Sequence, residues 1–188
     1  MKLKIASAFP LLAALATAFS LTGCVTSRMP VGDKIPALDP KAWNAKWRAG
    51  DGTVMSTHVK DAKFGLVEVT HLKAWTKPSP GDPQRDEVLI RMLGDWTIAN
   101  SPTDGGYNFE RINLDANGLV GFAADDTVFK TLIRRGLLPG RTAAKSNTCI
   151  IDHLNSRDIT RLKAAGIDIH TLFGENPGTV MIRDRRPW

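Results

Sequence analysis

Histidine pairs are the first candidates for chemistry, because two imidazoles on adjacent strands can hold a metal ion. His58 and His71 flank an expected hairpin turn, and a register that pairs residues whose numbers sum to 129 sets them opposite each other. A sum of 128 instead sets Val59 against Val69 and turns the two histidines to opposite faces. Matched apolar pairs stabilise a sheet, so we favour the second register and expect no metal site.

Cysteine chemistry is limited by distance. Cys149 and His153 alternate onto one face of an expected strand near 147–153, where residues four apart are roughly 13 Å apart. A nucleophile needs its base within about 3 Å, so we expect a buried, inert thiol in the apolar stretch 148–151.

The segment 113–118 is similar to the start of a calcium loop, but the position of the bidentate glutamate falls on Ala124, which predicts a hairpin turn instead.

Aromatic side chains are the remaining candidates for a binding site. Five of them are numerous enough either to fill a core, which is the commoner use, or to line a ligand pocket. These are Trp75, Trp96, Tyr107, Phe109 and Phe122. The charged neighbours Asp95, Glu110 and Arg111 have surface ion pairs as their default interpretation.

Catalytic motifs are missing from the sequence. It contains no Cys-x-x-Cys, no His-Glu-x-x-His, no Gly-x-Ser-x-Gly and no glycine-rich phosphate loop. Their joint absence makes an enzyme less expected without excluding one. We therefore name no catalytic residue, no metal and no cofactor.

The amino-terminal residues are those of a secretory signal. Lys2 and Lys4 precede an uncharged, mainly apolar run over 5–21, and small residues follow at 22–23. An uncleaved transmembrane anchor is the rival interpretation, but Pro10 and several hydroxyl residues weaken a span that is already short for a bilayer.

Leu21-Thr22-Gly23-Cys24 resembles the lipobox of bacterial lipoproteins. The resemblance implies cleavage before Cys24, a diacylglyceryl thioether on its sulfur, and acyl chains that hold the protein to a membrane. Two or three such chains anchor a protein stably. In that class an Asp after the cysteine favours the inner membrane of Gram-negative bacteria. Val25 stands there, so the resemblance implies an outer-membrane location facing the periplasm.

Charge and composition restrict the partners. The 188 residues carry a formal charge of +6, which falls to +4 when cleavage removes Lys2 and Lys4. A composition of 43% hydrophobic and 23% charged residues is that of a globular domain and excludes a disordered tail. The mild positive excess predicts no nucleic-acid site. The cluster of Arg183, Arg185 and Arg186 is either a solvated tail or a contact for anionic headgroups or wall polymers.

Short alternating segments predict a sheet. We expect strands near 45–49, 53–60, 66–73, 87–93, 95–100, 106–113 and 118–123. Asp51-Gly52 and Asn117-Gly118 are expected to supply positive φ at two tight turns, and residues 76–86 read as a loop.

The periodicity changes to helical after residue 124. We expect one helix capped by Asp125 and Asp126, another capped by Ser156, and a final strand over 179–183. This order predicts an α+β fold with a curved or barrel-like antiparallel sheet of about six to eight strands and two or three short helices in the C-terminal third. Trp43 and Trp47 are similar to the Gly-x-Trp opening of lipocalins, although the glycine is absent.

The domain organisation follows from these segments. We expect a cleaved signal peptide over 1–23, a lipidated cysteine and flexible tether over 24–41, and one periplasmic globular domain over 42–188. The tether is predicted from three prolines, a glycine and few large apolar side chains.

Three functions remain open at this point. The first is a lipid-anchored envelope lipoprotein with a non-catalytic binding or interaction role, whose partner is an envelope protein. The second is a lipocalin-like binder of a small apolar ligand, which requires an enclosed cavity of more than about 300 Å³ beside Trp96 and Phe109. The third is an enzyme, which requires His71, Asp95 or Glu110 to converge in one cleft.

Overall fold

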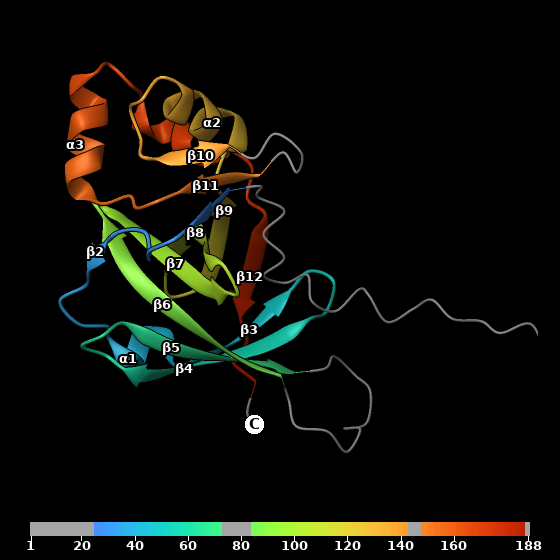
Figure 1. Ribbon diagram of the computed structural model, residues 1–188. Helices are drawn as coiled ribbons and strands as arrows, with labels where there is room; N and C mark the ends of the chain where they lie inside the picture. Colours follow the sequence, from blue (N-terminus) through green and yellow to red (C-terminus); the bar gives the residue numbers. More distant parts are fainter. Residues whose placement is uncertain (1–24, 73–83, 143–147, 187–188) are drawn as a thin grey trace, which may run out of the picture.

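The computed structural model describes residues 25–72, 84–142 and 148–186, and its centre is a closed antiparallel barrel of eight strands (Figure 1). Strands that follow each other from β3 to β9 pair in order, and β12 closes the ring by pairing with both β9 and β3. The eight strands are β3 (Ala45–Ala49), β4 (Val54–Asp61), β5 (Leu66–Leu72), β6 (Arg85–Leu93), β7 (Trp96–Thr103), β8 (Gly106–Leu114), β9 (Gly118–Ala123) and β12 (Thr179–Arg183). The expected α+β fold with a barrel-like sheet is confirmed.

The closing strand shows how alternation builds the barrel wall. Met181 points inward and is buried, whereas its neighbours Val180 and Ile182 are exposed on the outer face. Successive side chains of a strand point to opposite faces, so one apolar residue in two supplies the interior. Buried residues of the barrel strands and of the helix before β3 form this inner core.

A second layer covers one side of the barrel. It consists of the helices α2 (Asp126–Arg134) and α3 (Ser156–Ala164), the 3-10 helix η1 (Ile169–Leu172), and the short strands β10 (Gly140–Thr142) and β11 (Cys149–Ile151). In Figure 1 the helices α2 and α3 lie above the barrel with β10 and β11. A separate outer core fills the space between this layer and the outward-facing side chains of β7 and β8.

Side-chain caps start both helices. The carboxylate of Asp125 accepts from the backbone N–H groups of Thr127 and Val128, as expected, whereas Asp126 is the first residue of α2 and not a cap. The cap of α3 is Asn155 and not the expected Ser156, which is the first residue of the helix. Asn155 and Asp158 form a reciprocal capping box, which satisfies two N–H groups that have no partner within the helix.

Residues 25–41 are packed into the fold, so the expectation of a flexible tether is wrong. Strand β1 (Val25–Ser27) pairs antiparallel with β8 and parallel with β11, and β2 (Asp33–Lys34) pairs with β6. Gly106 on β8 permits this approach, because a Cβ there would lie 2.2 Å from the carbonyl oxygen of Ser27.

The few apolar residues of this segment hold it in place. Val31 is fully buried in the outer core and Leu38 is buried in the inner core. The short helix α1 (Pro40–Trp43) follows, and Trp43 is also buried. Val25, Val31 and Leu38 are thus buried within a stretch whose composition suggests a linker, and Trp43 is buried directly after it.

Two local expectations need correction. Gly118 does not have positive φ, because the turn before β9 is an Asx turn in which Asp115 accepts from the N–H groups of Asn117 and Gly118. The hairpin of β4 and β5 pairs Val59 with Val67, not with Val69. This register still places His58 and His71 on opposite faces, as expected.

Candidate functional site

The four described aromatic residues that were candidates for a ligand pocket lie on the outside of the barrel wall. Phe109 is buried in the outer core, where its ring makes edge contacts with Phe129 at 5.7 Å and Phe173 at 6.3 Å. Trp96 packs edge-on against Phe173 at 5.6 Å and His170 at 5.6 Å. The space beside Trp96 and Phe109 is therefore packed, and the cavity expected there is not present among the described residues.

The other members of that set are separated from one another. The guanidinium of Arg111 lies over the ring of Phe122, 4.2 Å from its centroid. Tyr107 lies on β8 opposite Pro102 of β7 and Ser27 of β1. Trp75 and Cys24 fall outside the described residues. These aromatics thus serve as packing and as a stacking surface for Arg111, and they do not surround a common pocket.

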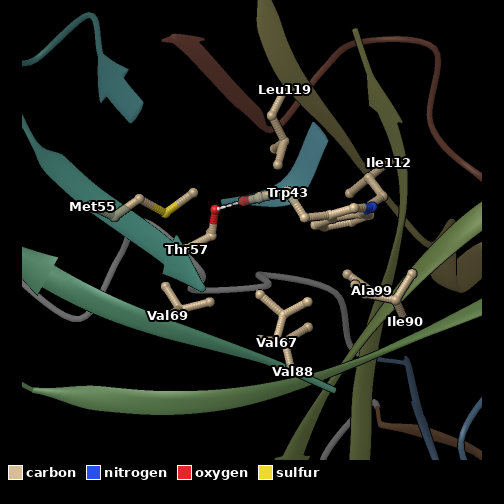
Figure 2. Close-up of a pocket in the computed structure, with 10 residues that line it drawn as sticks. All are labelled: Trp43, Met55, Thr57, Val67, Val69, Val88, Ile90, Ala99, Ile112 and Leu119. Atoms are coloured by element: carbon tan, nitrogen blue, oxygen red, sulfur yellow. Dashed lines mark hydrogen bonds between the residues drawn. The ribbon is translucent and has the colours of Figure 1, made fainter. Parts of the chain in front are cut away.

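Within the described residues, the barrel interior holds a small apolar cavity, shown in Figure 2. Its volume is about 20 Å³, little more than one water molecule needs. Ten residues line it: Trp43, Met55, Thr57, Val67, Val69, Val88, Ile90, Ala99, Ile112 and Leu119. Eight of these ten side chains are apolar. The other two are Thr57 and Trp43, and Trp43 presents its apolar ring to the cavity (Figure 2). The cavity is too small for a lipocalin-type ligand.

The hydroxyl group that lines this cavity is already hydrogen-bonded. Thr57 Oγ1 accepts from Trp47 Nε1 at 2.8 Å and donates to the backbone carbonyl of Trp43. In Figure 2 the Trp43 side chain points into the cavity. Helix α1 and these two tryptophans thus fill one end of the barrel, and Thr57 connects them.

A polar cleft of about 350 Å³ lies where β5 ends and β6 begins. His71 Nε2 is 3.0 Å from the Oδ2 atom of Asp86, and Ser101 and Asn108 line the same cleft. Val69 and Val88 border both this cleft and the inner cavity. The Asp86 carboxylate orients the His71 imidazole. Because the lining also includes the polar side chains of Ser101 and Asn108, the cleft can exchange hydrogen bonds with a polar molecule. The sequence alone does not reveal this cleft, because Asp86 of β6 falls in the segment 76–86 that was expected to be a loop.

The three residues required to converge in an active site do not do so. His71 is next to Gln84 before the start of β6, whereas Asp95 is in the turn after the end of β6. The nine residues of β6 span about 26 Å, so these two groups lie at opposite ends of the barrel. The structure thus gives no support to an active site built from this set.

Glu110 is a buried carboxylate in the barrel wall, which corrects its expected role in a surface ion pair. It is 3% exposed and faces inward between Ala99 of β7 and Ala123 of β9. Its carboxylate lies over Gly121, where a Cβ would be 2.6 Å from Oε2. Oε1 has no hydrogen-bond partner among the described residues. Burial without a partner raises the pKa of Glu110 to about 7.

A basic groove of about 600 Å³ runs over the outer face of β3 and β4 beside the residues that follow β12. Ten residues line it: Asn44, Ala45, Lys46, Ser56, Thr57, His58, Arg183, Asp184, Arg185 and Arg186. Four of them are cations and one is an acid. The sequence identified the three arginines as a cluster, but the pairing of β12 with β3 is what joins them to Lys46 and His58.

Cys149 is fully buried in the outer core, and burial raises the pKa of its thiol to about 11. His153 lies beyond the end of β11, and its Nδ1 is 3.1 Å from the Oδ2 atom of Asp158. The two residues therefore do not form a nucleophile and base, which agrees with the sequence-based expectation.

The described part of the chain shows neither a group of three or more metal-binding side chains nor a helix with the length and hydrophobicity required to span a bilayer. Comparisons of the chain with protein-family models, with curated proteins and with solved structures found no match. The polar cleft at His71 and the basic groove are two features of the described residues from which a function can be argued.

Proposed function

We propose that this protein is a lipid-anchored lipoprotein of the bacterial cell envelope, with acyl chains on Cys24, and that its barrel has a non-catalytic binding role at the outer membrane. The lipobox supports the anchor. The packed interior supports binding at the outer surface and disfavours the lipocalin-like alternative, although the eight-stranded barrel is compatible with it.

The position of Val25 determines how closely an anchored domain would sit to the membrane. Val25 is the first residue of β1, is 3% exposed, and pairs with Cys149 of β11. Consecutive Cα atoms are about 3.8 Å apart, so an acylated Cys24 would hold the sheet within a few ångströms of the lipid surface. The anchored protein would then sit directly on the membrane with β1 and β11 toward it, in contrast to a domain on a long linker.

Fatty-acid labelling in cells tests the anchor. Cys24→Ala should abolish incorporation of labelled fatty acid and leave a precursor of higher mass, because cleavage and acylation both depend on that sulfur. Cys149→Ala is the matched control and should be labelled like the parent, since its thiol is buried. Labelling that persists in Cys24→Ala would overturn the proposal.

A further inference from the structure

The basic groove carries an excess of positive charge. Its cations are Lys46, Arg183, Arg185 and Arg186, and Arg48 joins them through a 2.9 Å ion pair with Asp184. Among the described residues, the lining itself has four cations and one carboxylate, which is a formal excess of three.

Asp184, the one acid among the described residues that line the groove, is already neutralised. The side chain of Asp184 is 6% exposed and binds two guanidinium groups, those of Arg48 at 2.9 Å and Arg186 at 2.7 Å. The carboxylate therefore organises the arginines and leaves their net charge positive. An anion that enters the groove meets little repulsion from it.

Two further arginines are held by neutral acceptors. Arg183 donates to the backbone carbonyls of Lys41 and Ala42, at 2.9 Å and 3.1 Å. Arg185 donates to Asn117 Oδ1 at 3.2 Å. Hydrogen bonds to neutral oxygens fix the direction of a guanidinium without cancelling its charge, so both keep their attraction for an oxyanion.

The cations are fixed at separate points along the groove. Arg183 is held at α1, Arg185 at the turn between β8 and β9, and Lys46 lies on β3. These three anchor points belong to different elements of the fold, so the cations approach the groove from several directions. An extended chain of anionic groups is the ligand that can contact several of them together.

The groove lies on the side of the barrel away from β1. Strand β1 pairs with β8, and β4 is four strands from β8 in the eight-stranded ring, which is the opposite position. Figure 1 shows the same relation, with β11 and the helices at one end of the molecule and the C-terminus at the other. If Cys24 anchors the protein as proposed above, the groove faces away from that membrane.

We propose that this groove binds an extended anionic polymer bearing phosphate or carboxylate groups, such as a wall polymer facing the anchored protein. Its charge and the separate fixed cations carry the inference, and only the direction in which the groove faces rests on the proposed anchor. The bilayer that holds the acyl chains is not the partner, because the groove lies on the opposite side.

Binding to two polymers tests the site. The probes are inorganic polyphosphate and poly-glutamate, each fluorescently labelled, with the full chain in a non-ionic detergent. We expect saturable binding to at least one polymer, and Lys46→Gln with Arg185→Gln should weaken it about tenfold and reduce its salt dependence. The polymer that binds more tightly identifies the oxyanion.

The matched control removes two charges elsewhere. Arg157→Gln with Lys163→Gln changes exposed residues of α3, on the helical side of the molecule, and should alter the affinity by less than about twofold. Equal losses in the two double variants, or no binding by the parent to either polymer, would overturn the proposal. So would binding of the parent to phosphatidylglycerol vesicles but to neither polymer.

A Cys24→Ala chain should bind the polymer as the parent does, so failure of the anchor and failure of the groove are distinguishable.

Discussion

The side-chain amide of Asn100 on β7 binds the backbone of Val31 through both of its polar atoms. Asn100 Oδ1 accepts from the N–H of Val31 at 2.7 Å, and Nδ2 donates to the carbonyl of Val31 at 3.1 Å. Nδ2 also donates to the carbonyl of Leu89 at 3.1 Å. Both Asn100 and Val31 are fully buried, so this amide fixes the amino-terminal segment to the barrel.

Asn100→Ala should therefore lower the free energy of unfolding by about 3 kcal/mol, because it leaves buried backbone groups without partners. Denaturation by urea measures this change, and limited trypsin digestion should show faster cleavage at Arg28 or Lys34. Asn113→Ala, on the exposed face of β8, is the control and should have little effect. Equal stability of the two variants would contradict the role given to Asn100.

Glu110 should make the stability of the protein depend on pH. Its pKa is about 7 in the folded state against an ordinary value of 4.5, so the folded chain keeps a proton that the unfolded chain has released between these values. The free energy of unfolding should therefore fall by about 3 kcal/mol as the pH rises from 4.5 to 7, and change little from this group above that range.

Glu110→Gln should remove that dependence and be more stable than the parent at pH 8, because the amide stays neutral. Urea denaturation of both chains at pH 5 and pH 8 measures the difference. Glu175→Gln changes an exposed carboxylate and should follow the parent. Parallel pH profiles for the parent and Glu110→Gln would show that Glu110 does not titrate in this range.

Cys149 should be unreactive in the folded protein. With a pKa of about 11, about one thiol in a thousand is ionised at pH 8, and the side chain is fully buried. In a Cys24→Ala chain we expect no appreciable reaction with a disulfide reagent under native conditions and one equivalent in guanidinium chloride. Rapid native labelling would mean that β11 opens readily.

Local sequence patterns determined most of the secondary structure. The alternation of apolar residues predicted β3, β5 and β9 over their observed residues or within one residue of them, and Asp125 predicted the start of α2. These features depend on backbone and side-chain preferences within a few residues, so they can be recognised without knowledge of the fold.

Tertiary structure decided the features that depend on residues far apart in the chain. Whether Glu110 and Phe109 face the barrel interior or the outer core depends on how the sheet curves and on which side the helices cover, and neither is encoded in alternation alone. Similarly, β1 became ordered only through pairing with β8 and β11, and the basic groove formed only when β12 closed the ring beside β3. Sequence periodicity specifies which residues share a face, whereas only the packing of distant strands decides what that face contacts.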